Sequence, residues 1–198
     1  MIQRPKKAIV FDFDGTITDS MEMENISMAK AIHSVGCISI SPEDITGHYG
    51  PTERGIISSI VPPGKEEEAW KNCLVYYREL SKNLKPFDGI IDILSSLKQR
   101  ESMIFLVTGR SRETLDISLH DMNLERYFLK TYTGSDSGTN KEKSLTSLFN
   151  DFNLKNILSA GYSHDKDYRI QLEKKNPGNV CASVQELKNR LMEITESH

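Results

Sequence analysis

Short apolar runs alternate with longer amphipathic segments along most of this chain. The short runs are bounded by turn residues and predict strands buried in a parallel sheet, at residues 7–11, 103–107, 128–133, 156–160 and 179–182. Apolar residues spaced three and four positions apart predict helices, at residues 90–98, 111–122, 141–152 and 168–175. Strands and helices that alternate in this way predict an α/β fold, with a Rossmann-like three-layer α/β/α core and a parallel sheet.

Between the first two strands, the alternation is interrupted by a stretch with helical signals alone. Asp19 and Glu22 have the spacing of a capping box and predict the start of its first helix. Apolar residues at helical spacing predict a longer helix near its end. We therefore expect an all-helical cap domain of residues 18–85, inserted into a core domain made of residues 1–17 and 86–198.

The composition limits which cellular compartment and which binding partners are expected for the protein. The chain has 198 residues, of which 37% are hydrophobic, and a net charge of −3, so nothing indicates a nucleic-acid surface. Cys37, Cys73 and Cys181 are too far apart for a zinc or disulfide framework, and free thiols fit a reducing compartment. No stretch approaches the ~20 apolar residues of a membrane span. We expect a cytoplasmic monomer with no nucleic-acid or membrane partner.

Polar residues follow the predicted strands, and ligands of open α/β sheets bind beyond the carboxyl ends of the strands. Asp12 and Asp14 come directly after the first strand and, two residues apart, can project to one side. Two carboxylates this close repel each other, and a divalent cation such as Mg²⁺, which prefers oxygen ligands, removes the repulsion. One carboxylate can then attack phosphorus while the other transfers protons. Gly15 allows a sharp turn that presents backbone N–H groups to an anion.

The segment VFDFDGTITDS, at residues 10–20, resembles the first motif of the haloacid dehalogenase superfamily. It is similar to the phosphatase branch that includes phosphoglycolate phosphatase and β-phosphoglucomutase. That branch carries a helical cap between its first and second motifs, where the helical stretch lies here. Residues 86–89, PFDG before an apolar helix, resemble the return from cap to core. The resemblance extends over nearly the whole chain and implies a Mg²⁺-dependent phosphatase that acts on a small phosphorylated metabolite.

The resemblance also implies roles for the matched residues. Asp12 would be the nucleophile that forms an aspartyl-phosphate. Asp14 would protonate the leaving oxygen and then activate the water that hydrolyses the intermediate. Thr108 matches the threonine of the second motif, whose hydroxyl holds the transferring phosphoryl group with help from the Gly109 N–H.

The third motif of the family is a lysine that neutralises charge on the phosphate and the nucleophile. Lys141 and Lys143 are both possible, and the ordinary alternative for either is a solvated lysine at a helix start. Lys143 fits the family spacing better, because it lies five residues after Gly138 and just before apolar helix positions. We therefore predict Lys143 as the catalytic and phosphate-binding lysine.

The fourth motif departs from the family pattern. A metal-binding acid should follow the glycine at the end of the fourth strand, but Gly161 is followed by Tyr162. Acids come later, at Asp165 and Asp167, and we prefer Asp165. The predicted metal ligands are therefore Asp12, Asp14 and Asp165, a set that could still hold Mg²⁺ because this ion keeps several waters.

Three hypotheses of function follow. The first is a phosphatase that hydrolyses a small phosphomonoester. The second is a phosphomutase, which needs a second phosphate site in the cap, where Arg54 is the residue to suspect. The third is a catalytically weakened scaffold with a binding role, suggested by Tyr162. Arg110, directly after the second motif, is assigned no role at this stage.

Overall fold

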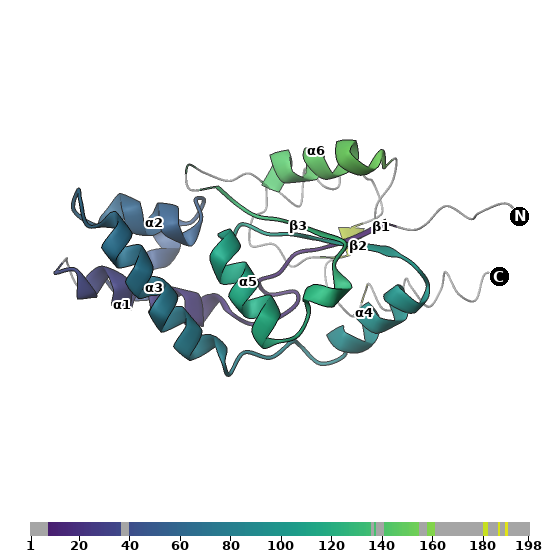
Figure 1. Ribbon diagram of the computed structural model, residues 1–198, viewed down its shortest axis with the longest axis horizontal. Coiled ribbons are helices and arrows are strands. Elements are labelled where there is room, and N and C mark those ends of the chain that lie inside the picture. The colour runs from purple at the N-terminus through teal and green to yellow at the C-terminus, as the bar shows by residue number, and fades with distance from the viewer. Residues whose placement is uncertain are drawn as a thin grey trace, which may run out of the picture.

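The computed structural model describes residues 8–36, 40–135, 137, 141–154, 158–160, 180, 181, 186 and 189 (Figure 1). Five strands form one sheet in the order β3-β2-β1-β4-β5, and every neighbouring pair is parallel. The strands are β1 (Ala8–Phe11), β2 (Met103–Val107), β3 (Lys130–Tyr132), β4 (Leu158–Ala160) and β5 (Val180–Cys181). The predicted α/β fold with a parallel sheet is confirmed.

The central strand β1 is buried on both faces, as its uninterrupted apolar sequence predicts. Ile9 and Phe11 pack into one hydrophobic cluster, and Ala8 and Val10 pack into another on the opposite face. The first cluster is completed by α4 (Ile90–Gln99) and α5 (Arg112–Asp121), and the second by α6 (Lys141–Phe152). Figure 1 shows these helices on the two sides of the sheet, so the core has three layers.

The stretch after β1 forms a helical block with a hydrophobic cluster of its own. The block contains α1 (Met21–Ser34), η1 (Asp44–His48), α2 (Glu53–Ile60) and α3 (Glu66–Ser81). Ile32, Ile57 and Trp70 are buried between these helices. Figure 1 shows the block beside the sheet rather than over either of its faces.

The predicted capping box at the start of α1 does not form. The N-cap is Ser20 rather than Asp19, and it makes no side-chain cap hydrogen bond. The Ser20 hydroxyl instead donates a hydrogen bond to Asp14 over 2.5 Å. The first helix of the block is therefore tied to the loop after β1.

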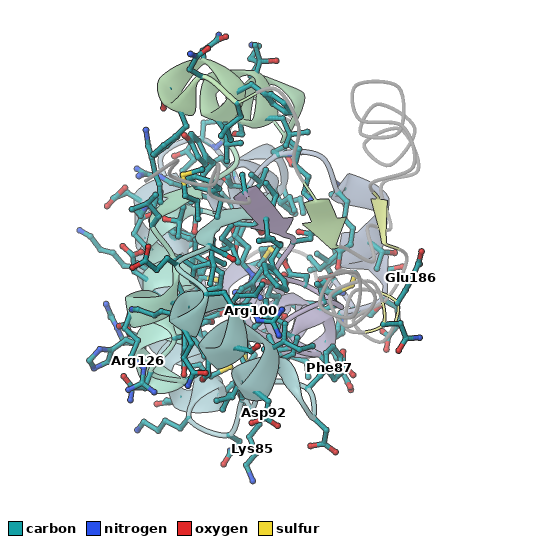
Figure 2. The ribbon with its side chains drawn as sticks, turned by 90° about the vertical axis from the view of Figure 1, so that its right-hand side faces the viewer. Lys85, Phe87, Asp92, Arg100, Arg126 and Glu186 are labelled. Atoms are coloured by element: carbon teal, nitrogen blue, oxygen red, sulfur yellow. The ribbon has the colours of Figure 1, made fainter. Side chains whose placement is uncertain are left out.

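The two chain segments that join the block to the sheet run side by side. Phe87 N–H donates to the Ile17 carbonyl over 2.8 Å, and the Thr18 hydroxyl donates to the Lys85 carbonyl over 2.7 Å. In Figure 2, Lys85 and Phe87 lie at the same end of the molecule as Asp92 of α4. The chain therefore leaves and re-enters the core at one place.

Polar contacts also hold the helical block against the core. Glu53 of α2 accepts a hydrogen bond from the Ser111 N–H over 2.7 Å and another from the Thr114 hydroxyl, at the start of α5. Ser81, the last residue of α3, donates to Asp121 over 2.6 Å.

No helix in the described part of the chain is both long and apolar enough to cross a membrane. The helix predicted for residues 168–175 lies outside the described residues.

Candidate active site

The loop after β1 fixes Asp12 at the carboxyl edge of the sheet. Phe13 and Ile17 are fully buried, and the Ile17 N–H donates to the Phe13 carbonyl over 2.8 Å. Gly15 has φ +69°, a conformation that glycine adopts without strain, so the chain reverses there as predicted. The Phe13 N–H donates to Asp12 Oδ1 over 2.8 Å. The buried apolar side chains thus anchor a rigid turn that holds one Asp12 oxygen in place.

The other Asp12 oxygen is paired with a lysine of α6, the helix that covers the sheet face opposite to α4 and α5. Lys141, the first residue of α6, places its Nζ 2.9 Å from Asp12 Oδ2. The Lys141 side chain is only 15% exposed and that of Asp12 3%. Burial raises the pKa of Asp12, and the nearby Lys141 lowers it without cancelling that effect. The pair is therefore a buried carboxylate in direct contact with a largely buried ammonium group.

Thr108 directly follows the neighbouring strand β2 at the same edge of the sheet. It is fully buried, and its N–H donates to the Tyr132 carbonyl over 3.0 Å, which extends the pairing of β2 with β3. Its hydroxyl accepts a hydrogen bond from the Arg110 N–H over 3.3 Å. The next residue, Gly109, lies close to the Lys141 side chain, because a Cβ atom at position 109 would be 3.8 Å from Lys141 Cε. Thr108 and Gly109 thus sit beside the Asp12–Lys141 pair.

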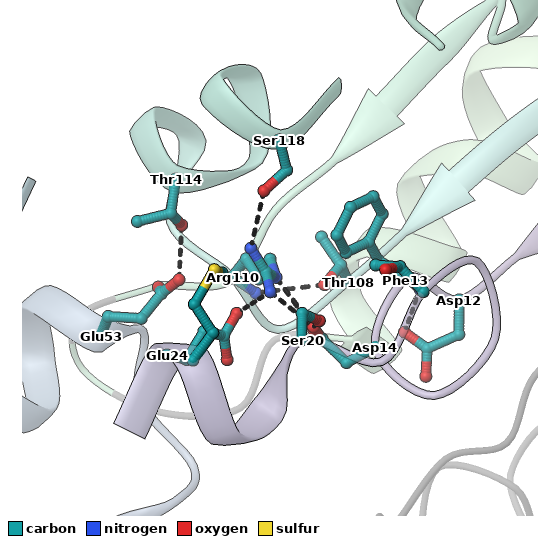
Figure 3. A network of polar contacts seen from close by, with 12 residues as sticks. Asp12, Phe13, Asp14, Ser20, Glu24, Glu53, Thr108, Arg110, Thr114 and Ser118 are labelled. Carbon is teal, nitrogen blue, oxygen red and sulfur yellow. Dashed lines mark hydrogen bonds and ion pairs between the residues drawn. The ribbon is translucent and has the colours of Figure 1, made fainter. Parts of the chain in front are cut away.

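The second carboxylate of the loop, Asp14, is paired with a buried arginine, Arg110 (Figure 3). Arg110 Nε lies 3.0 Å from Asp14 Oδ1 and 3.1 Å from Oδ2, and Arg110 Nη2 lies 2.7 Å from Oδ1. Burial alone would raise the pKa of Asp14, but the Arg110 guanidinium outweighs it and holds that pKa below its usual value. Asp14 is thus an ionised, firmly held carboxylate.

Sequence comparison identifies the fold family of this arrangement. The family described as haloacid dehalogenase-like hydrolase matches residues 9–159. The chain belongs to the haloacid dehalogenase-like hydrolase family. The match includes Asp12, Asp14, Thr108 and Lys141, so the carboxyl-edge site lies within the family region.

Individual relatives of this hydrolase family are distant. The chain is 26% identical over 141 residues to phosphoglycolate phosphatase of Aquifex aeolicus, covering 71% of this chain and 66% of that one. It is 21% identical over 125 residues to pyrophosphatase PpaX of Bacillus cereus, covering 61% of this chain and 56% of the relative. The aligned regions thus span less than two thirds of these curated relatives.

Solved structures of the family share the fold. The structure of CbbY from Rhodobacter sphaeroides, in complex with phosphate, aligns with a TM-score of 0.68 at 12% identity. The alignment covers 90% of this chain and 94% of that chain. A hydrolase from Streptococcus pneumoniae aligns with a TM-score of 0.57 at 18% identity, over 95% and 99% of the two chains. At such identities, the likeness concerns the fold.

The structure gives the two candidate lysines of this hydrolase fold different surroundings. Lys143 was predicted to lie against the nucleophile, but its side chain is exposed. Lys141 takes that place instead, as its contact with Asp12 shows. The two residues are two positions apart on one helix and therefore point roughly 200° apart around its axis. Only the first can face the sheet edge while the apolar residues of α6 pack on the sheet.

The predicted metal ligands are described only in part. Among the residues that the structure covers, no group of three or more His, Cys, Asp and Glu side chains could hold a metal ion. Asp12 offers a buried carboxylate, and burial raises its pKa despite the adjacent Lys141. The Asp14 carboxylate is already paired with Arg110. Tyr162, Asp165 and Asp167 lie outside the described residues. The donor chemistry at Asp12 thus fits Mg²⁺, provided that further oxygen ligands complete the set.

Arg110 is the residue of the site to which sequence reasoning assigned no role. Its position directly after Thr108 placed it near the edge of the sheet, but nothing in the local pattern predicts that an arginine is buried. Its side chain is 2% exposed and pairs with acids from two segments, Asp14 and Glu24, that are distant from it in the sequence. Only the tertiary structure brings these charges together.

Gly134, in the loop after β3, packs closely against the backbone of Gly109. A Cβ at this position would lie 2.1 Å from the Gly109 carbonyl oxygen and 3.0 Å from Thr52 Cγ2. The Gly134 N–H also donates to the Arg110 carbonyl over 2.8 Å. Gly134→Ala should therefore force the two loops apart and lower the free energy of unfolding by about 1–3 kcal/mol.

Chemical denaturation of the Gly134→Ala variant measures this effect, with Gly47→Ala as the matched control. A Cβ at Gly47 would meet no atom within 4 Å. The control should therefore unfold within about 0.5 kcal/mol of the wild type. Equal stability of the two variants would show that the loops at Gly134 and Gly109 do not pack as closely as described.

Proposed function

We propose that this chain is a phosphatase that hydrolyses a small phosphomonoester through an aspartyl-phosphate on Asp12. The observation that carries the proposal is the buried Asp12 carboxylate in contact with Lys141, at the carboxyl edge of a parallel sheet. Ligand sites of open α/β sheets lie at that edge. Membership of a hydrolase family and relatives named as phosphatases support the same reaction.

In the proposed first step, an Asp12 oxygen attacks phosphorus while the bond from phosphorus to the leaving oxygen breaks. Lys141 offsets negative charge that Asp12 and the phosphoryl oxygens share during the transfer. The Thr108 hydroxyl and the backbone N–H of Gly109 would donate hydrogen bonds to the phosphoryl oxygens. The Gly15 N–H, predicted to do the same, instead donates to the Thr18 carbonyl over 2.9 Å. In this arrangement, the nucleophile and the charge-stabilising groups are held before substrate arrives.

In the proposed second step, water attacks the aspartyl-phosphate, phosphate leaves and Asp12 is restored. Asp14 would take the proton from that water, and its lowered pKa is consistent with the ionised form that a base requires. In the first step, Asp14 would give a proton to the leaving oxygen, which an acid of lowered pKa does less readily at neutral pH. This difference favours substrates with leaving groups that are stable as anions.

We further propose that Mg²⁺ is the cofactor. Asp12 and Asp165 would hold it through their carboxylates, and Asp14 through its main-chain carbonyl, since its carboxylate is paired with Arg110. When bound, the ion would offset the negative charge of the phosphoryl group and of Asp12.

We propose that residues 18–85 form a helical cap and that residues 1–17 and 86–198 form the core. The separate hydrophobic cluster of the helical block and the adjacent segments at Ile17 and Phe87 support this division. A small phosphorylated metabolite as substrate, a monomeric state and a cytoplasmic location complete the proposal.

Of the two alternatives, one is favoured by a specific observation. The pairing of Asp14 with Arg110 removes a free carboxylate from the site, which is consistent with a weakened enzyme that binds a ligand with little turnover. The phosphomutase alternative gains no such support. Arg54, its suggested phosphate ligand, is 43% exposed and forms an ion pair with Glu67.

Phosphate release from purified protein tests the proposal. The panel would contain phosphoglycolate, sugar phosphates, nucleoside monophosphates, β-glycerophosphate and p-nitrophenyl phosphate, each with Mg²⁺ and with a chelator. We expect Mg²⁺-dependent release, fastest for leaving groups that are stable as anions. Absence of release across the panel from folded protein in excess Mg²⁺ would overturn the proposal in favour of the binding scaffold.

A further inference from the structure

The guanidinium of Arg110 lies at the centre of a buried polar network that joins the active-site loop to the helical block (Figure 3). We propose that Arg110 is a positioning residue for Asp14, and that the helical block in turn fixes Arg110. The proposal rests on the phosphatase function proposed above. It assigns a role to a residue that touches neither the nucleophile nor the transferring phosphoryl group.

The contacts at Asp14 leave its carboxylate little freedom. Arg110 Nε reaches both Asp14 oxygens, at 3.0 and 3.1 Å, and the Ser20 hydroxyl donates to Oδ1 over 2.5 Å. A planar guanidinium that donates two N–H groups to one carboxylate fixes its orientation as well as its distance. The direction in which Asp14 presents an oxygen to the reacting atoms is therefore set by Arg110.

Arg110 is itself held by residues of the helical block. It forms an ion pair with Glu24 of α1, and its Nη1 donates a hydrogen bond to the Tyr77 hydroxyl of α3. The Tyr77 hydroxyl also lies 2.5 Å from the Ser118 hydroxyl of α5, in the core. Three helices thus converge on one side chain.

Aromatic rings and charge complete the surroundings of Arg110. The guanidinium carbon lies 4.7 Å from the centroid of the Phe13 ring and 5.6 Å from that of Tyr77, within the range of cation–π contacts. One cation faces two acids, the partly buried Asp14 and the buried Glu24. Both acids are paired with the same guanidinium, which also contacts Tyr77 of α3. The orientation of Asp14 is therefore linked to how α1 and α3 pack against the core.

A purely structural role for Arg110 would also explain its burial, so the test must separate the two roles. A double-mutant cycle between Arg110 and Asp14 does so, because residues that act through each other have non-additive effects. The variants are Arg110→Lys, Asp14→Asn and their combination. Lysine keeps the charge but cannot donate two N–H groups to one carboxylate.

Arg112→Lys provides the matched control. Arg112 lies two positions away and is 46% exposed, and it is paired with Asp116 and hydrogen-bonded to the Thr131 carbonyl, outside the Arg110 network. The assay is phosphate release from the alkyl phosphomonoester of the panel with the highest turnover. An alkyl leaving group depends on proton transfer and therefore on the orientation of Asp14.

We expect Arg110→Lys to lower kcat about tenfold and to change KM by less than about threefold, because the interaction acts on the reacting state. In the Asp14→Asn background, the same substitution should change kcat by less than about twofold. Arg112→Lys should leave both parameters near wild-type values. An equal loss from Arg110→Lys in both backgrounds would show that Arg110 acts on structure alone and would overturn the proposal.

Two further measurements keep the inference separate from the proposed function. If the wild type releases no phosphate, the function fails, and the same cycle is measured by urea unfolding. Coupling of about tenfold in the unfolding constant, or ~1.4 kcal/mol, would support positioning, and additivity would overturn it. If Arg110→Lys does not fold, Tyr77→Phe replaces it in the cycle. That variant removes one anchor of Arg110 and should also lose its effect in the Asp14→Asn background.

Discussion

Asp12→Asn should reduce phosphate release at least about 1,000-fold, because the amide that replaces the carboxylate is too weak a nucleophile to form an aspartyl-phosphate. Asparagine has nearly the same shape, and its side-chain oxygen can still accept the hydrogen bond from the Phe13 N–H. Burial of the Asp12 charge is unfavourable, as its raised pKa indicates. We therefore expect the variant to remain folded, with the loss confined to chemistry.

Phosphate release from the best substrate of the panel measures this loss, and a thermal melt of the same sample reports folding. Asp19→Asn is the matched control, because Asp19 lies in the same segment and its side chain is exposed. The control should release phosphate within about twofold of the wild type. A folded Asp12→Asn variant that retained the wild-type rate would remove the nucleophile from the account.

Lys141→Met should lower kcat about 100-fold, whereas Lys143→Met should change it by less than about twofold. Methionine keeps most of the length of the side chain that passes over Gly109, so packing there is largely retained. The lost charge leaves Asp12 and the phosphoryl group without their nearest cation, which lies 2.9 Å from Asp12 Oδ2. Lys143 is exposed on the same helix and serves as the control.

Steady-state kinetics of the two lysine variants decides between the positions. A larger loss for Lys143→Met than for Lys141→Met would contradict the geometry described here and restore the prediction from spacing. Equal and small losses would show that the cation at Asp12 is not needed for turnover.

The sheet and the position of its carboxylates could be predicted from the sequence. The apolar run before Asp12 has no polar interruption, which indicates burial on both faces, and the structure has Ile9 and Val10 in opposite clusters. The helix predicted for residues 111–122 was also confirmed as α5, and its N-cap, Ser111, accepts a side-chain hydrogen bond from the Thr114 N–H. These features depend on local pattern, which a single sequence contains.

The identity of the contacting lysine could not be read from the sequence, because it depends on where α6 begins relative to the sheet. Spacing within a motif does not specify which face of a helix meets the site. Lys141 reaches Asp12 because it is the first residue of α6, and side chains of a helix tilt toward its N-terminus.

The Arg110 network was beyond prediction for a different reason. Its partners Asp14, Glu24 and Tyr77 come from separate elements, and their meeting depends on how the helical block sits against the core. The contact of Ser20 could not be predicted for the same reason. Asp19 was expected to cap α1, but the N-cap is Ser20, and its hydroxyl donates a hydrogen bond to Asp14 instead.

Detection of a phosphoryl group on Asp12 tests the central claim most directly. Protein mixed with the best substrate of the panel and Mg²⁺ would be quenched in acid, digested and examined by mass spectrometry. We predict a phosphorylated peptide that contains Asp12 in the wild type and no such peptide in Asp12→Asn. Phosphate release by the wild type with a phosphoryl group found on another residue would contradict the account.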